Sequence, residues 1–396
     1  MNRVLIVAYY TPPLGLSGVM RVTKLAKFLP KFGWEVLLLT VKNVAYYAYD
    51  PELLEDLKQA KVFRTESLDP NRLLRFFGAK VVREGVSSGP KLLKTVVRRI
   101  LFPDSKVGWL PFAIWAGKKV ITRFQPKVIF ATAPPWTALL VGATLSRMSG
   151  LPLVADFRDP WPEGFLEPPS GQKAKLEKMR QWMLQQAKLT LAVNYETARR
   201  VGNGVEVLEN GFDPDVMAVA AEPLEGFSIL YAGNVWRQEE RLKEVVEALS
   251  AVPDARLYIA GGVDEKTGRM LAGSSQVRLL GVVSHRRTLS LMKGAQVLLY
   301  LGKPGQPVGL KLYEYLGSGR PIVVWEEDVA ESARIISETK RGVVCQNRED
   351  FFACVSELRS KWLSGREVEW QGSDVDRYNR QFQAKKLAEY LEDLLK

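Results

Sequence analysis

The feature that most constrains the fold is a regular alternation of short apolar runs with longer amphipathic stretches. Runs rich in Val, Ile and Leu without strict apolar–polar alternation are typical of strands covered on both faces. Such runs occur at residues 4–8, 35–39, 127–131, 153–155, 189–193, 228–232, 255–260, 277–280, 297–301 and 322–324. Helical periodicity fills many of the gaps, for example at residues 19–31, 241–249 and 330–337. The pattern therefore predicts an α/β protein with parallel sheets.

The alternation runs twice along the 396 residues, a length that suits two or three domains. Residues 210–226 begin with Asn-Gly-Phe-Asp-Pro, are rich in Ala, Pro and Glu, and lack a strong period, as linkers do. We therefore expect one Rossmann-like domain over residues 1–212 and a second over residues 213–372. Residues 373–396 carry apolar residues at helical spacing and are predicted to form a terminal helix.

The N-terminus and the cysteines bear on the compartment in which the chain works. The first apolar run soon reaches Pro12 and Pro13, so a buried strand explains it better than a secretory signal does. No apolar run reaches transmembrane length. Cys345 and Cys354 fit no zinc spacing and no disulfide framework. We therefore expect a cytoplasmic protein.

Histidine is almost absent, because His285 is the only one in the chain. A histidine-based metal centre or a Ser-His-Asp triad is therefore not expected. His285 stands at the predicted start of a helix, and we predict a structural or surface role for it.

The net charge of +12 is unevenly distributed, since residues 61–127 hold 15 Lys and Arg against 4 Asp and Glu. This excess predicts an anionic partner for the N-terminal half: nucleic acid, an anionic membrane surface or a phosphorylated acceptor. Residues 91–102 place basic residues beside apolar ones at helical spacing, near an apolar stretch at residues 73–77. This pattern fits an interfacial helix on anionic lipid and equally an ordinary packed helix. No nucleic-acid recognition motif accompanies the charge, so nucleic acid is not an expected partner.

Gly15 and Gly18 stand where the first strand turns into a helix. Glycines at such a turn let backbone N–H groups approach a ligand, and the helix N-terminus favours phosphate. A plain Gly/Pro turn is the alternative.

Polar residues follow another strand of the first half. Asp156, Arg158 and Asp159 come at its carboxyl end, where open α/β sheets bind ligands. The two aspartates could accept a proton or hydroxyl hydrogen bonds, while Trp136 and Trp161 could stack on a sugar. The alternative is a capping aspartate with an Asp–Arg pair that closes a loop.

The second half opens with a similar turn, in which Gly233 and Asn234 follow a strand and Arg237 offers bidentate donors for a diphosphate. Its strongest cluster is residues 305–322, where a Gly/Pro loop leads into one short helix, then Gly-x-Gly-Arg-Pro and a strand. We expect Gly309, Leu310, Lys311 and Glu314 of this cluster to bind the donor. Lys311 and Glu314 are three apart and share a helix face. Lys311 could meet phosphate and Glu314 could accept hydrogen bonds from ribose hydroxyls, the alternative being a surface ion pair.

These clusters together resemble the family 4 glycosyltransferases, through YYTPPLGLSG, TAPPW, DFRDPW, NGFD, YAGNV and KLYEYLGSGRPIVV in that order. The resemblance covers nearly the whole chain. It implies the GT-B fold, in which two Rossmann-like domains have parallel sheets that face across a cleft and a C-terminal helix returns to the first domain. It also implies a nucleoside diphosphate sugar as donor, a glycan or lipid-linked acceptor in polysaccharide biosynthesis, and no metal or other cofactor.

The resemblance also assigns roles to residues. Gln306 stands where the family has the first glutamate of a Glu-(seven residues)-Glu motif, which lies by the transferred sugar, and Glu314 matches the second, which contacts ribose. Lys311, with Arg237 in place of the family's usual arginine, would stabilise the departing diphosphate with help from the Gly15–Gly18 loop. The family implies retention of configuration, with Asp156 or Asp159 orienting the acceptor.

Gln306 leaves two alternatives open, because an amide cannot carry the charge of the family's glutamate. One of the two aspartates could instead be the general base of an inverting reaction. The chain could also be a catalytically inactive partner protein that binds sugar nucleotides. A basic nucleic-acid binder is the third and least favoured reading.

Overall fold

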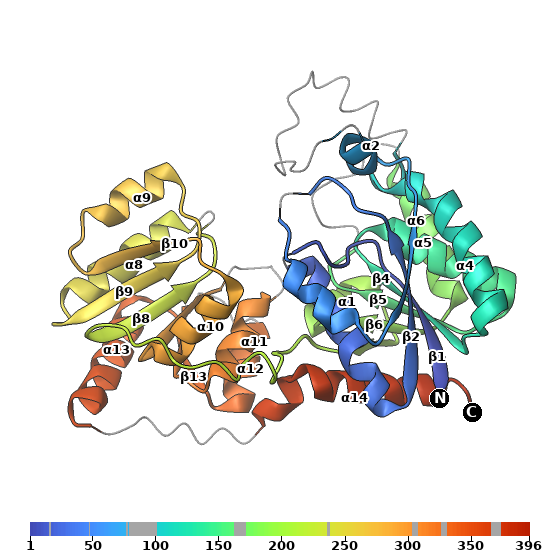
Figure 1. Ribbon diagram of the computed structural model, residues 1–396. Helices are drawn as coiled ribbons and strands as arrows, with labels where there is room; N and C mark the ends of the chain where they lie inside the picture. Colours follow the sequence, from blue (N-terminus) through green and yellow to red (C-terminus); the bar gives the residue numbers. More distant parts are fainter. Residues whose placement is uncertain are drawn as a thin grey trace. The chain divides into compact units, whose positions relative to one another are not determined.

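The computed structural model describes residues 1–15, 17–46, 48–76, 78, 101–161, 172–235, 238–302, 308–325, 331–365 and 374–396. Their contacts divide the chain into two compact units (Figure 1). Unit 1 comprises Met1–Glu209 with Arg380–Lys396, and unit 2 comprises Asn210–Asn379.

Unit 1 is built on a parallel sheet with the strand order β3-β2-β1-β4-β5-β6-β7. This is the order of a doubly wound, Rossmann-like sheet. The strands are β1 Asn2–Val7, β2 Trp34–Val41, β3 Lys61–Thr65, β4 Val128–Ala133, β5 Leu153–Phe157, β6 Ala187–Ala192 and β7 Val205–Val207. The helices are α1 Ser17–Phe28, η1 Leu29–Phe32, η2 Pro51–Leu57, α2 Pro70–Phe76, η3 Val107–Trp109, α4 Leu110–Phe124, α5 Trp136–Ser149, α6 Lys173–Gln186, α7 Tyr195–Val201 and α14 Arg380–Asp393.

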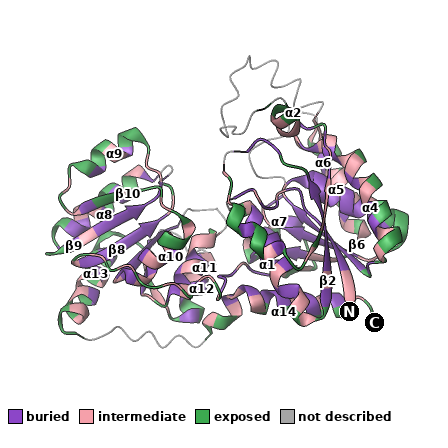
Figure 2. Cartoon of the chain, viewed as in Figure 1, coloured by how far each residue is buried: buried purple, intermediate pink, exposed green. Residues whose placement is uncertain are grey.

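Successive residues of the central strands of unit 1 enter two different cores. Leu5 and Val7 of β1 belong to a cluster that includes residues of α4 and α5, whereas Val4 and Ile6 join residues of α1 and α14. Since side chains alternate along a strand, the two clusters lie on opposite faces of the sheet. Both faces are therefore covered, which explains the continuous apolar runs and the buried strands in Figure 2.

Unit 2 repeats this arrangement on a parallel sheet with the order β10-β9-β8-β11-β12-β13. Its strands are β8 Phe227–Ala232, β9 Ala255–Ala260, β10 Val277–Gly281, β11 Val297–Leu301, β12 Ile322–Trp325 and β13 Gly342–Cys345. Its helices are α8 Glu239–Ser250, α9 Glu265–Ala272, α10 His285–Gly294, α11 Leu310–Ser318, α12 Glu331–Thr339, α13 Arg348–Leu363 and η4 Val375–Tyr378. Ile229 and Tyr231 of β8 pack with α8 and α13, and Leu230 and Ala232 pack with α10 and α11.

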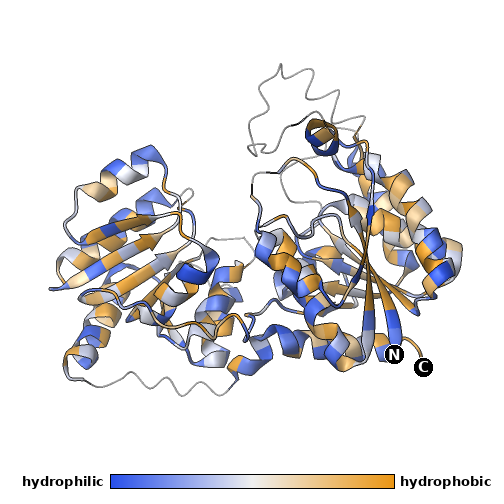
Figure 3. Cartoon of the chain, in the orientation of Figure 1, coloured by the Kyte–Doolittle hydropathy of each residue, from blue (hydrophilic) through white to orange (hydrophobic). Residues whose placement is uncertain are grey.

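The predicted fold class, two parallel-sheet α/β domains of Rossmann type, is confirmed. Each of the ten predicted apolar runs overlaps a strand, and these strands are among the most hydrophobic parts of the chain (Figure 3). Three strands were not predicted: β3, β7 and β13. All three lie at sheet edges and carry exposed or half-buried residues, so their apolar signal is weak.

The C-terminal segment is interrupted, whereas one helix was expected from residue 374 onwards. η4 ends at Tyr378, and Asn379 has extended backbone angles before α14 begins. The Tyr378 carbonyl accepts the Phe212 N–H at 2.9 Å, so η4 stays with unit 2. α14 instead packs on α1 in unit 1, where Leu387 and Leu391 are fully buried.

No helix among the described residues is long and apolar enough to cross a membrane.

Candidate functional site

α11 carries Lys311 and Glu314 and is fixed against the sheet of unit 2 by a buried tyrosine. The Tyr315 hydroxyl accepts a hydrogen bond from the Ala232 N–H at 2.8 Å and donates to the Leu299 carbonyl at 3.3 Å. Burial raises the pKa of Tyr315, so the hydroxyl keeps its proton. Because Tyr315 lies one helical turn after Lys311, this anchor also sets where the lysine is held.

The Lys311 ammonium lies at the beginning of α11, beside the turn that follows β8. Its Nζ is 4.0 Å from the ring centroid of Tyr231 and 5.4 Å from that of Tyr300. The Tyr300 hydroxyl accepts the N–H of Gly309, the residue that precedes the helix, at 3.1 Å. A Cβ on Gly233 would lie 3.9 Å from the Lys311 Nζ. The lysine, the helix N-terminus and the glycine turn therefore meet at the carboxyl end of β8.

The turn after β8 is itself closely packed. Gly233 has a φ of 123° and donates its N–H to the Ala260 carbonyl at 2.8 Å. A Cβ on Gly261 would lie 2.1 Å from the Gly233 carbonyl oxygen, so the two turns can approach this closely only because Gly261 lacks a side chain. The Asn234 Oδ1 accepts the Gly262 N–H at 2.8 Å, which ties the same two turns together.

Glu314 has an unexpected neighbour. The His285 Nε2 lies 2.9 Å from the Glu314 Oε1, with side-chain exposures of 37% and 21%. His285 is the first residue of α10, and the residue spacing of 29 gives no local signal that would have linked the two. Sequence reasoning placed His285 on the surface or in a structural role and missed this contact.

Two expected site residues, Arg237 and Gln306, lie outside the described residues, as do residues 91–100 of the expected interfacial helix. Leu310 is the first residue of α11 and is half-buried. No group of three or more His, Cys, Asp or Glu able to hold a metal is found in the part of the chain that the structure describes.

Asp156, at the end of β5 in unit 1, is engaged in a buried ion pair. Its Oδ1 accepts from the Arg21 Nη2 at 2.7 Å and its Oδ2 from the Arg21 Nε at 3.0 Å. The Thr132 hydroxyl donates to Oδ2 at 2.6 Å, and Arg21 also donates to the Glu209 carbonyl. The Arg21 and Asp156 side chains are only 3% and 0% exposed. Both oxygens of Asp156 are therefore engaged in buried hydrogen bonds, as is typical of a carboxylate with a structural role.

Arg158 is also tied to the backbone, since it donates to the carbonyls of Gly18, Ala133 and Pro134. It therefore links the start of α1 to the segment after β4. Burial lowers the pKa of Arg158, and the charges of nearby Asp159 and Asp156 partly oppose that shift.

Asp159 differs from Asp156 in its surroundings. It is half-buried, and burial raises the pKa of its carboxyl group while the Arg158 charge opposes that rise. Within the part of the chain that the structure describes, no hydrogen bond reaches the Asp159 carboxylate. A half-buried carboxyl group with a raised pKa and a charged neighbour is a candidate for a functional role.

The remaining residues predicted for unit 1 are engaged within it. The Trp136 and Trp161 rings pack edge to face at 4.5 Å and are 8% and 5% exposed. The Gly15 N–H donates to the Ala48 carbonyl at 3.0 Å. Their predicted contacts with acceptor and donor stay predictions.

Two family models match the chain. The model described as Glycosyltransferase Family 4 matches residues 18–216, half of the chain, and the model described as Glycosyl transferases group 1 matches residues 226–361. The chain belongs to glycosyltransferase family 4. The resemblance drawn from the sequence motifs is thereby confirmed, and the protein is a glycosyltransferase.

No functionally curated protein matches the glycosyltransferase in sequence. Solved structures share its fold along the whole chain. They include sucrose-phosphate synthase from Thermosynechococcus elongatus, with a TM-score of 0.64 and 14% identity over 100% of this chain and 99% of that one. Anabaena HepE in complex with UDP has a TM-score of 0.64 and 15% identity over 99% and 100% of the two chains. A glycosyltransferase from Rickettsia africae has a TM-score of 0.63 and 13% identity over 100% and 99%.

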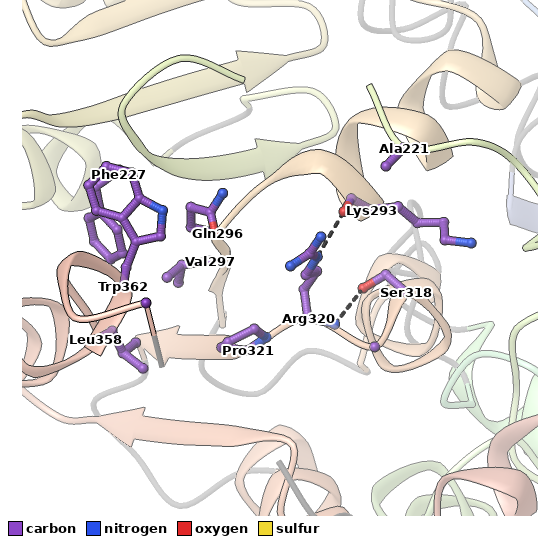
Figure 4. A pocket seen from close by; sticks show the side chains of 12 residues that line it. Ala221, Phe227, Lys293, Gln296, Val297, Ser318, Arg320, Pro321, Leu358 and Trp362 are labelled. Atoms are coloured by element: carbon purple, nitrogen blue, oxygen red, sulfur yellow. Dashed lines mark hydrogen bonds between the residues drawn. The ribbon is translucent and has the colours of Figure 1, made fainter. Parts of the chain in front are cut away.

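A cavity of about 660 Å³ lies elsewhere in unit 2 of the glycosyltransferase (Figure 4). It is lined by the beginnings of strands, including Phe227 of β8 and Val297 of β11, together with Lys293, Arg320 and Trp362. Lys311 lies by the opposite, carboxyl end of β8. Since ligands of open α/β sheets bind at the carboxyl ends of the strands, this cavity is not the candidate donor site.

Proposed function

We propose that the glycosyltransferase uses a nucleoside diphosphate sugar, without a metal and with retention of configuration, and transfers the sugar to a glycan or lipid-linked acceptor. The observation that carries the proposal is the position of Lys311 and Glu314 on one anchored face of α11, beside the Gly233 turn. A helix N-terminus with a lysine and a glycine turn is well suited to a diphosphate. HepE, which shares the fold, has been crystallised with UDP and with UDP-glucose.

In this mechanism the Lys311 ammonium stabilises the negative charge that develops on the departing diphosphate. Glu314 accepts hydrogen bonds from the ribose hydroxyls and so fixes the nucleoside. Asp159 orients the acceptor hydroxyl, because its carboxylate is less engaged than that of Asp156. Gln306 and Arg237 keep the roles that the family implies, beside the transferred sugar and on the diphosphate.

A thermal-shift panel tests the donor class. A ligand that binds only the native state raises the apparent stability by RT ln(1 + [L]/Kd), about 2.7 kcal/mol at a concentration 100 times Kd. We expect one family of nucleoside diphosphate sugars to raise the melting temperature without added metal, and EDTA to leave that rise unchanged. A flat response to UDP-, GDP-, ADP-, CDP- and dTDP-sugars would contradict the proposed donor.

Unit 1 also offers a surface suited to a lipid-linked acceptor. α2 buries none of its residues and exposes Leu73, Leu74 and Phe76, the last 75% exposed (Figure 2). Arg75 stands between these residues in the sequence, and residues 61–127 carry the excess of Lys and Arg described above. Exposed apolar side chains among basic ones favour the surface of an anionic membrane. We propose that the enzyme binds peripherally through α2 and the segment at residues 91–102, which is basic in sequence.

Replacing Leu73, Leu74 and Phe76 with Ser should reduce co-sedimentation with anionic phosphatidylglycerol vesicles several-fold, because the buried apolar area is lost. Donor-induced thermal shifts should be unchanged. A matched control replaces Phe352 and Leu363, two exposed apolar residues of α13, with Ser and should sediment as the wild type does. Equal sedimentation of the α2 variant and the wild type would count against membrane binding through α2.

A further inference from the structure

The only histidine of the chain lies against the glutamate proposed to bind ribose. The 2.9 Å distance between the His285 Nε2 and the Glu314 Oε1 is that of a hydrogen bond. An ionised carboxylate can only accept, so the Nε2 must carry the hydrogen. Among the described residues, no hydrogen bond reaches the second oxygen, Oε2.

His285 is the first residue of α10, a helix that is capped and packed against its neighbours. α10 begins with Ser284 as N-cap, whose hydroxyl accepts the Arg287 N–H, while Leu289 and Met292 are buried beneath the helix. α10 also packs directly on α11, the helix of Glu314. The imidazole therefore meets the carboxylate from a second, independently anchored helix.

A glutamate side chain has several rotatable bonds, and a free carboxylate loses conformational freedom when it binds a ligand. A hydrogen-bond donor that holds one carboxylate oxygen before the ligand arrives reduces the entropy lost on binding. It also fixes the direction of the other oxygen. We propose that His285 is a positioning residue that orients Glu314 for recognition of the ribose hydroxyls of the donor, an inference that rests on the proposed function.

The partial exposure of His285 and Glu314 distinguishes a positioning role of His285 from a purely structural one. Both side chains are partly exposed, and an ion pair or hydrogen bond of that kind contributes little to folding. Loss of the imidazole should therefore appear in ribose recognition and not in the stability of unit 2.

The experiment compares His285→Ala, His285→Gln and the neighbouring Arg286→Ala. Arg286 is an exposed cation of the same helical turn and serves as the matched control. Titration calorimetry measures the Kd of UDP, GDP, ADP and CDP and of their 2′-deoxy forms for each variant. With the sugar nucleotide identified by the thermal-shift panel, steady-state rates give the KM and kcat for the donor.

For the nucleotide that binds the wild type, His285→Ala should raise the Kd of the ribose form by about tenfold. This is the size expected for one hydrogen bond to a charged group. The 2′-deoxy form should weaken far less, so the preference for ribose shrinks. His285→Gln, which keeps an N–H donor, should restore most of that preference, and Arg286→Ala should match the wild type. In His285→Ala the donor KM should rise more than kcat falls.

Equal weakening of the ribose and deoxyribose forms, or no change in either, would overturn the role of His285 while leaving the proposed function in place. Failure of the wild type to bind any of the four nucleoside diphosphates, with a thermal shift from a dTDP-sugar alone, would overturn this inference and leave the proposed function in place. Failure to bind any nucleotide of either panel would overturn the proposed function and this inference together.

Discussion

Replacing Lys311 with Ala should lower the rate of sugar transfer by about 10²–10³-fold, the loss typical when one preorganised group that stabilises transition-state charge is removed. The ammonium lies by the N-terminus of α11 and within 3.9 Å of where a Cβ on Gly233 would stand, so it faces the place proposed for the diphosphate. Nucleotide affinity should fall as well, because the same charge acts in the ground state. Steady-state rates with the best donor of the thermal-shift panel provide the measurement.

The variant should stay folded, because the contact between the Lys311 ammonium and the Tyr231 ring adds little to the stability of unit 2. A cation–π contact of this kind contributes about 0.5–1 kcal/mol at a partly exposed site. Lys266→Ala, which removes an exposed cation from α9 of the same unit, is the matched control and should keep the wild-type rate. Wild-type turnover by Lys311→Ala, with an unchanged melting temperature, would remove the lysine from the proposed mechanism.

The sheets were predictable from the sequence where their strands are covered on both faces. β1, β4, β8 and β11 have continuous apolar runs because α-helices pack on each side. The edge strands β3, β7 and β13 were missed for the same physical reason, since each carries exposed or half-buried residues. β10 is the exception, an edge strand with exposed residues that was predicted because its sequence still contains three apolar residues in a run of four.

The site was predictable only where it is local in sequence. Lys311 and Glu314 share a helix face through their spacing, which the sequence displays directly. The contact between Glu314 and His285 depends on how α10 packs against α11, which no spacing rule contains. The anchoring hydroxyl of Tyr315 was missed likewise, because its partners lie on two strands distant in sequence.

Asp156→Ala should destabilise unit 1 by about 3–5 kcal/mol, the cost of leaving one partner of a buried ion pair without its counter-charge. Arg21, 3% exposed, would keep its charge and its hydrogen bond to the Glu209 carbonyl but lose its counter-charge, and the Thr132 hydroxyl would lose its acceptor. For a unit of this size the melting temperature should fall by about 10 °C. Replacing Arg21 with Met and Asp156 with Leu together should cost less than Asp156→Ala alone, because no buried charge is left over.

Asp159→Asn is the matched comparison. Its effect on the melting temperature should have the opposite sign to that of Asp156→Ala. Because burial raises the pKa of Asp159 above its unfolded value, the stability associated with the protonated form is lost as pH rises through the folded pKa. The neutral amide should therefore leave the melting temperature unchanged at acid pH and raise it slightly at pH 8. Transfer should fall, because Asp159 is the carboxylate proposed to orient the acceptor. An Asp156→Ala variant as stable as the wild type but inactive would instead assign the chemistry to Asp156, since a structural ion pair cannot be removed without loss of stability.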